Sequence, residues 1–213
     1  MFVIFEAKIG EWGIASSEQD KKTIPTTHLL LATAIYMTIT NNQYDKAIGS
    51  CKEIFLKKTR DYGTAWRVLR TISIVDQIFI KAQRVRTIQE KGEQKVADDI
   101  AAEFKGIINY AVIGLIQLEL PVEAPEEMEV SEVSRLFDKH VLVAKDLMND
   151  KNHDYGEAWR SMSQESFIDL ILMKLQRIRQ ILNNDGKTIM SEGIDANYLD
   201  IINYAVFALI LMS

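Results

Sequence analysis

The sequence predicts an all-α fold, a pseudo-twofold helical bundle built from two fused three-helix repeats. The first observation is an internal repeat, because the pattern Asp-Tyr-Gly-x-Ala-Trp-Arg stands at residues 61–67 and again at residues 154–160, a displacement of 93 positions (154 − 61). The second is that apolar residues recur at helical spacing in both copies. The third is that no alternating strand pattern follows residue 40. A repeat of this length indicates a duplicated structural unit.

The repeat extends through the helices that follow each motif. The same displacement aligns six polar residues of the next helix: Ser73 with Ser166, Asp76 with Asp169, Lys81 with Lys174, Gln83 with Gln176, Arg84 with Arg177, and Arg86 with Arg179. One position is gained in the following loop, so Ile-Ile-Asn-Tyr-Ala-Val at residues 107–112 matches residues 201–206. Two fused copies give the pseudo-symmetric counterpart of a homodimer, so we expect sites between helices of the repeats.

The chain divides into four segments around this repeat. Residues 1–40 have no counterpart in the second copy and are interpreted as an N-terminal extension of low order. Residues 41–119 form the first helical repeat and residues 132–213 the second, and the two repeats make one compact domain. Residues 120–131 form an acidic linker with Pro121 and Pro125, whose glutamates predict a solvated surface.

Capping residues and glycines predict where the helices of the first repeat begin and end. Asn41 or Asn42 can cap a first helix that runs through residues 43–58. Gly63 ends this helix, because glycine readily adopts a positive φ. Ser73, with Asp76 three residues on, favours a capped start for the second helix. A third helix, from about residue 96 to residue 118, is apolar nearly all round and is expected at the centre.

The second repeat predicts the same elements in the same order. A helix runs from Ser131 to about residue 149, and the Asp154 corner follows it. A second helix runs from Ser166 to about residue 182, with Asp169 again as the capping acid. An Asn-Asn-Asp-Gly turn at residues 183–186 then leads to a last helix that reaches the C-terminus.

The bulk composition restricts the class of partner. A formal net charge of -5 and the lack of a basic run argue against binding to duplex nucleic acid. Cys51 is the only cysteine, so no intramolecular disulfide forms, as is typical of a cytoplasmic protein. The best membrane candidate, residues 29–39, is about half the roughly 20 residues that span a bilayer. We therefore expect a cytoplasmic protein without membrane association.

Two lysines lie where apolar residues are expected. At about 100° per residue, Lys81 falls inside the apolar stripe of residues 74–88, and Lys174 falls inside the corresponding stripe of the second copy. Arg84 and Arg177 flank these stripes one turn further on. A buried lysine must reach water, lose its proton or meet an anion, and snorkelling toward water is the simplest of these outcomes.

The last helix carries a matching polar stripe of Asn197, Asp200 and Tyr204, with Asn203 beside it. The first copy has Glu103, Gly106, Tyr110 and Asn109 at those places. Two interpretations stay open. An internal Lys–Asp pair would fix the helix register without any chemistry. An anion or Mg²⁺–phosphate site would place phosphate on the cations and a hard metal ion on the carboxylates.

These residues resemble a known family. The patterns Asp-Tyr-Gly-x-Ala-Trp-Arg, Lys-x-x-Arg and Asp-x-x-Asn-Tyr-Ala resemble the nucleotide modification associated domain 1 family, over about residues 43–213 in two copies. The resemblance implies a place in nucleotide or modified-base metabolism. It falls on Asp154, Tyr155, Gly156, Lys174, Arg177, Asp200, Asn203 and Tyr204 in the second copy, and on Asp61, Tyr62, Gly63, Lys81, Arg84, Asn109 and Tyr110 in the first. Gly106 departs from the pattern where an acid is expected.

A looser similarity is to the MazG-like all-α nucleoside triphosphate pyrophosphohydrolases. That similarity implies Mg²⁺ held by acidic pairs on neighbouring helices. Here Asp200 keeps one acid of such a pair in the second copy, and Glu103 keeps the other in the first. Glu126 and Glu129 have the spacing of a partner pair, but they lie in the acidic linker.

We therefore predict a nucleotide-binding protein, with Mg²⁺-dependent hydrolysis of a nucleotide phosphate chain as its enzymatic form. The predicted ligand-binding residues are Lys174, Arg177, Asn203, Tyr204, Asp154, Tyr155, Lys81, Arg84, Asn109, Tyr110, Asp61 and Tyr62. The predicted metal ligands are Asp200 and Glu103. The partner is a nucleotide or another phosphate-bearing small molecule, and a homodimer is compatible with the sequence. The alternative is a non-enzymatic helical interaction module with a structural buried Lys–Asp cluster, so enzymatic activity stays open.

Overall fold

The computed structural model describes the backbone of residues 26–92, 99–121, 123–190 and 192–213, and the side chains of these ranges from residue 38 onward. The chain separates into two compact units, Met1–Ile35 and Tyr36–Ser213. Of the first unit, only residues 26–35 are described, and they are helical. The remainder of the predicted N-terminal extension, residues 1–25, lies outside the described residues. The helical bundle and its candidate site belong to the second unit.

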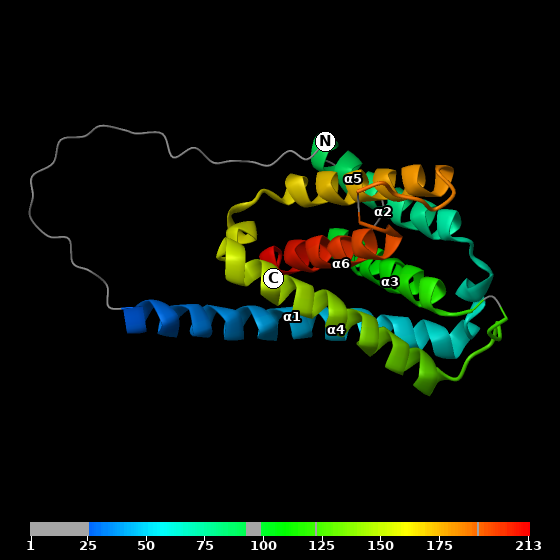
Figure 1. Cartoon of the computed structure of the whole chain (residues 1–213), viewed down its shortest axis with the longest axis horizontal. Helices are drawn as coiled ribbons and strands as arrows, with labels where there is room; N and C mark the ends of the chain where they lie inside the picture. Colours follow the sequence, from blue (N-terminus) through cyan, green and yellow to red (C-terminus); the bar gives the residue numbers. More distant parts are fainter. Residues whose placement is uncertain (1–25, 93–98, 122, 191) are drawn as a thin grey trace, which may run out of the picture. The chain divides into compact units, whose positions relative to one another are not determined.

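All regular secondary structure in the described ranges is helical, as predicted (Figure 1). The α-helices are α1 (Thr26–Tyr62), α2 (Thr71–Lys91), α3 (Ile100–Glu119), α4 (Val130–Tyr155), α5 (Gln164–Asn183) and α6 (Ile194–Leu211). Two short 3-10 helices, η1 (Ala65–Val68) and η2 (Ala158–Ser161), form the corners that follow α1 and α4. The three-helix unit of the first repeat therefore recurs in the second.

The ends of α1 and α4 fall where the repeated glycines predict them. Gly63 and Gly156 each follow the last helical residue, and each has a φ of +62°. A residue with a side chain rarely adopts this left-handed conformation, whereas glycine does so without a steric penalty. The glycine of each motif thus turns the chain from the first helix of its repeat into the corner.

Two predicted helix starts differ from the structure. Helix α1 begins at Thr26 rather than near Asn41, because no glycine or proline stands between Pro25 and Gly49 to interrupt it. Helix α2 begins at Thr71, so Asp76 lies inside the helix and does not cap it. In α5 the N-cap is Ser163, whose hydroxyl accepts from the Ser166 amide. The capping role predicted for Asp76 and Asp169 is therefore wrong.

Within the unit Tyr36–Ser213, α3 and α6 lie between the α2/α5 pair and the α1/α4 pair (Figure 1). The two central helices approach closely because Gly114 of α3 faces Tyr198 of α6, where an added Cβ would lie 2.6 Å from Tyr198 Cζ. By length and composition alone, α3 and α6 could each span a membrane, but 61% and 67% of their most apolar windows are buried inside the protein. Their apolarity is thus accounted for by the core.

Reciprocal ion pairs show the approximate twofold relation between the repeats. Lys52 Nζ lies 2.6 Å from Asp138 Oδ2, and Lys145 Nζ lies 2.6 Å from Asp45 Oδ1. Each lysine and each aspartate is displaced by 93 positions from its counterpart (145 − 52, 138 − 45). An interface in which residue i contacts j while j contacts i is the mark of twofold symmetry.

A second reciprocal set joins α2 to α5. Arg179 Nη2 lies 2.8 Å from Asp76 Oδ1, and Arg86 Nη1 lies 3.9 Å from Asp169 Oδ1. The aspartates that the sequence assigned to helix caps instead face arginines of the other repeat. These four residues therefore repeat, between α2 and α5, the reciprocal pattern seen between α1 and α4.

Buried tyrosines make the stability of the fold sensitive to alkaline pH. Burial raises the pKa of Tyr204 to about 12, and it raises the pKa of Tyr44 and of Tyr198 well above the ordinary value. An unfolded tyrosine ionises near pH 10, so above that pH the unfolded state binds fewer protons than the folded state. We expect the free energy of unfolding to fall above about pH 10, by up to about 1.4 kcal/mol per pH unit for each tyrosine.

Urea denaturation between neutral pH and about pH 11.5 measures this slope. Tyr198→Phe is expected to reduce the slope without loss of stability at pH 7, because the Tyr198 hydroxyl is buried and has no hydrogen-bond partner among the described residues. Tyr155→Phe is the control, since Tyr155 is 73% exposed. An unchanged slope in Tyr198→Phe would refute the assignment.

Candidate functional site

A cavity of about 530 Å³ lies in the first repeat, between the end of α1, the η1 corner, α2 and α3. Three lysines line it, Lys58, Lys81 and Lys105. Its aromatic lining consists of Phe55, Tyr62, Trp66 and Tyr110. Cavities of this volume are typical of sites for small-molecule ligands.

The lining residues reach the cavity because each helix directs one face toward it. Lys58 and Tyr62 are four residues apart in the last turns of α1, and Gln77 and Lys81 are four apart in α2. Residues at that spacing share a helix face. On α3 the lining positions 102, 105, 106, 109, 110 and 113 follow the same period. Each of the three helices of the first repeat therefore contributes one face to the cavity wall.

The charge on the described lining is positive, since it includes three lysines and no acid. Lys81 Nζ lies 3.2 Å from Glu103 Oε2, and the other oxygen of this carboxylate pairs with Arg84. Lys58 and Lys105 have no ion-pair partner within 4 Å among the residues that the structure describes. The cavity is therefore positively charged, and two of its three lysines have no carboxylate partner within 4 Å among the described residues.

Two lining residues each carry a buried polar atom without a hydrogen-bond partner in the described part of the chain, Trp66 Nε1 and Asn109 Oδ1. Their counterparts are satisfied: Trp159 Nε1 donates to Asn152 Oδ1 at 3.1 Å, and Asn203 Oδ1 accepts from Tyr44 at 2.9 Å.

Sequence differences between the repeats explain these two atoms. The place of Asn152 is held in the first repeat by Thr59, whose hydroxyl bonds to the Phe55 carbonyl. The place of Tyr44 is held in the second repeat by Phe137, which cannot donate. Two residues of the cavity lining therefore keep a buried donor and a buried acceptor unpaired, whereas the second repeat pairs both.

In the corresponding region of the second repeat, an aromatic side chain packs on the tryptophan of the motif. Trp159 stacks on Phe207 with a centroid distance of 4.2 Å and an interplanar angle of 6°. Phe207 stands at the place of Ile113 (113 + 94), and Leu199 stands at the place of Lys105 (105 + 94). The second repeat thus has a phenylalanine ring where the first has the smaller Ile113, and an apolar leucine where the first has the charged Lys105.

A buried ion pair occupies the centre of this second region. Lys174 Nζ donates to Asp200 Oδ2, and the two side chains are 7% and 6% exposed. Lys151 Nζ lies 2.6 Å from Asp200 Oδ1. The predicted proximity of Lys174 to Asp200 is therefore observed, whereas Arg177 is exposed and forms no ion pair with this carboxylate in the described structure.

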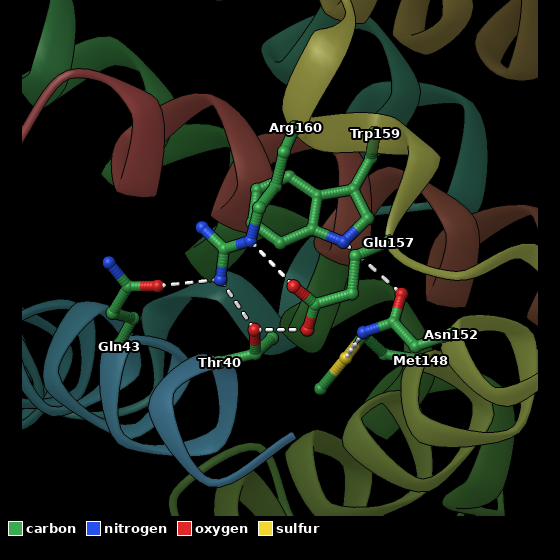
Figure 2. A network of polar contacts seen from close by, with 7 residues as sticks. All are labelled: Thr40, Gln43, Met148, Asn152, Glu157, Trp159 and Arg160. Carbon is green, nitrogen blue, oxygen red and sulfur yellow. Dashed lines mark hydrogen bonds and ion pairs between the residues drawn. The ribbon is translucent and has the colours of Figure 1, made fainter. Parts of the chain in front are cut away.

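A polar network closes the second corner and ties it to α1 (Figure 2). Arg160 Nε lies 2.6 Å from Glu157 Oε2, and Arg160 Nη2 donates to Gln43 Oε1 at 2.8 Å. The Thr40 hydroxyl donates to Glu157 and accepts from Arg160. The guanidinium also lies 4.3 Å from the centroid of the Trp159 ring. The arginine of the repeated motif therefore has a structural role here.

In the first corner, the corresponding arginine, Arg67, and the neighbouring Thr64 form hydrogen bonds with the main chain of the linker instead. Thr64 Oγ1 donates to the Glu126 carbonyl and accepts from the Met128 amide at 3.0 Å. Arg67 Nη2 donates to the Ala124 carbonyl at 3.1 Å. Glu123, Glu126, Glu127 and Glu129 of the linker are exposed as predicted, but its main chain is held by the η1 corner.

The predicted ligand-binding residues separate into three groups. Lys81, Asn109, Tyr110 and Tyr62 line the cavity, while Arg84 lies beside it on Glu103. Lys174, Asn203 and the half-buried Tyr204 belong to the corresponding region of the second repeat. The other four, Asp61, Asp154, Tyr155 and Arg177, are exposed and lie outside both regions.

Sequence reasoning missed Lys58, Lys105 and Trp66 as lining residues. The signal for Lys58 was present, because Lys58 and Lys151 both stand three residues before the Asp-Tyr-Gly motif. Lys105 has no basic counterpart in the second copy, so the repeat could not indicate it.

The two predicted metal ligands do not fit Mg²⁺ as they lie in the structure. Asp200 contacts Lys174 and Lys151, and Glu103 contacts Lys81 and Arg84. Two cationic side chains on each carboxylate oppose a further cation. Within the described ranges, no three acidic, histidine or cysteine side chains gather in a possible metal site. The Mg²⁺ assignment stays a prediction.

Comparison with known proteins assigns the family. The model of the nucleotide modification associated domain 1 matches twice, at residues 58–118 and 151–212. Neither the curated proteins nor the solved structures include a match. The looser similarity to MazG-like enzymes finds no support in these comparisons. The two matched segments cover more than half of the chain, and each carries the motif, the second helix and the third helix of one repeat. The chain therefore belongs to the nucleotide modification associated domain 1 family, with two tandem copies of the domain.

Proposed function

We propose that this protein binds a nucleotide in the cavity of the first repeat. The observation that carries the proposal is the combination of three lysines with aromatic rings around one space of about 530 Å³. A nucleotide presents the same two chemistries, an anionic phosphate and a flat aromatic base. The family's association with nucleotide modification agrees with this ligand class.

The two parts of the lining suit the two parts of the ligand. Lysine ammonium groups bind phosphate oxygens as compact point charges. Trp66 and Tyr110 present rings of the kind on which bases stack. Trp66 Nε1 and Asn109 Oδ1 supply a donor and an acceptor that polar groups on a base edge would satisfy after a small rearrangement.

The proposal is limited to binding. Glu103, the carboxylate in contact with Lys81, already pairs with two cationic side chains of the protein, Lys81 and Arg84. Hydrolysis of the phosphate chain would be a further property of the same site. The cytoplasm, where nucleotides are abundant, is the proposed location.

Isothermal titration calorimetry with a panel of nucleoside monophosphates and triphosphates tests the proposal. Lys58→Met and Lys105→Leu are each expected to weaken binding about 10- to 100-fold, as the loss of a charged hydrogen bond implies. Lys105→Leu also reproduces the residue that the second repeat has at this place, Leu199.

The matched control is Lys57→Met, because Lys57 lies next to Lys58 on α1 but is 65% exposed and pairs with Glu53. This replacement is expected to leave the affinity unchanged. If wild type binds no nucleotide, with or without Mg²⁺, the proposal fails and the non-enzymatic helical module is favoured. Equal losses in Lys57→Met and Lys58→Met would reveal a nonspecific charge effect.

A further inference from the structure

We infer that the anionic group of the ligand, a phosphate or a carboxylate, binds between Lys58 and Lys81 at Gly106, in the place that the Asp200 carboxylate takes in the second repeat. The inference rests on the proposed function for the presence of a ligand. It goes further by assigning the position and the chemistry of one subsite.

The second repeat shows what this arrangement holds. Asp200 directs one oxygen to each of two lysines, Oδ1 to Lys151 Nζ at 2.6 Å and Oδ2 to Lys174 Nζ. The carboxylate is thus a bridging oxyanion between a lysine from the first helix of its repeat and a lysine from the second. The acid itself comes from the third helix.

The first repeat keeps both lysines and lacks the acid. Lys58 corresponds to Lys151 (151 − 58 = 93), Lys81 corresponds to Lys174 (174 − 81 = 93), and Gly106 corresponds to Asp200 (200 − 106 = 94). Lys58, Lys81 and Gly106 all line the cavity. The two cations that share an internal carboxylate in one repeat therefore both line the cavity in the other, where no acid stands at the corresponding position of the third helix.

The protein contacts of these two lysines leave both able to bind an anion. Lys58 has no ion-pair partner within 4 Å among the described residues. Lys81 reaches Glu103 at 3.2 Å, but Glu103 is shared with Arg84. The absence of a side chain at Gly106 leaves room that the flexible end of Lys81 enters, since its Cε lies 2.8 Å from the position of an added Cβ. A ligand oxyanion there would complete the pattern of the second repeat.

This geometry also defines the chemical class of the group. It must offer at least two oxygens and a negative charge, since each lysine receives a separate oxygen in the second repeat. A phosphate monoester carries more charge than a carboxylate and is expected to bind more tightly. In the second repeat, the carboxylate of Asp200 takes the place that the anionic group of the ligand takes in the first.

The test compares Gly106→Asp with Gly106→Asn, two replacements of nearly the same volume that differ in charge. Either new side chain requires the end of Lys81 to shift, so this cost is common to both variants and cancels in their comparison. Both variants are titrated with inorganic phosphate, acetate and the best-bound nucleotide, after circular dichroism confirms that each is folded. Gly106→Asp is expected to bind phosphate and nucleotide at least about tenfold more weakly than Gly106→Asn, because its carboxylate competes for the same lysines.

The outcomes separate this inference from the proposed function. If wild type and Gly106→Asp bind nucleotide equally, or if both variants lose affinity equally, the anion subsite is refuted while nucleotide binding stands. If wild type binds phosphate but no nucleotide, and Gly106→Asp binds neither, the subsite is supported and the nucleotide proposal fails. If wild type binds none of the three probes, both fail.

Discussion

Replacing Asp200 with asparagine is expected to lower the free energy of unfolding by about 3–5 kcal/mol, because removing one partner of a buried ion pair leaves an uncompensated charge. Asp200 accepts from both Lys174 and Lys151. The side chains of Lys174 and Asp200 are 7% and 6% exposed, so water has little access to replace the lost carboxylate. Urea denaturation measures the change.

The control is Asp138→Asn, which removes a pair whose side chains, Lys52 and Asp138, are 25% and 60% exposed. Exposed pairs contribute little, so the expected loss is below about 1 kcal/mol. The double replacement Lys174→Met with Asp200→Leu is expected to recover most of the stability, since apolar residues of similar volume can replace a buried pair. A similar small loss in Asp200→Asn and Asp138→Asn would contradict a structural pair in the second repeat.

Replacing Ile113 with phenylalanine is expected to close the cavity and to weaken nucleotide binding by more than about tenfold. Phe207, the counterpart of Ile113, stacks on Trp159 at 4.2 Å. A phenylalanine at position 113 would place its ring against Trp66 in the same way. Because an aromatic pair is worth about 0.5–1.5 kcal/mol, the free energy of unfolding is expected to rise as binding is lost.

Calorimetry and thermal denaturation on the same sample follow both effects. Ile113→Leu is the control, because it conserves volume and is expected to change stability by less than about 1.5 kcal/mol with binding retained. Wild-type affinity in a folded Ile113→Phe protein would show that the nucleotide binds elsewhere.

The fold was predictable because the repeat and the helical period are local properties of the chain. The glycines after α1 and α4 mark the ends of those helices directly. The start of α1 was not predictable from Asn41, since a capping residue also occurs inside a helix when no breaker precedes it. Asp76 and Asp169 were misassigned because their partners, arginines of the other repeat, depend on how helices pack.

The candidate site was predictable only in part, namely where it follows from the helical period. The helical wheel placed Lys174 and Asp200 on facing stripes, and the structure brings them together. It could not show that the open space lies in the first repeat. The two repeats differ in the size of the side chain at this place, Ile113 in the first and Phe207 in the second. The spacing of apolar residues along the sequence does not reveal how much volume the packed helices leave between them.

The reciprocal ion pairs, Lys52 with Asp138 and Lys145 with Asp45, bear on how such a chain can evolve. In a dimer of identical subunits, any substitution appears in both halves at once. A fused pair keeps the mutual contacts but frees each half to accept changes on its own. One half can therefore retain a cavity for a ligand, while the other half loses its ligand site and contributes only to the stability of the fold.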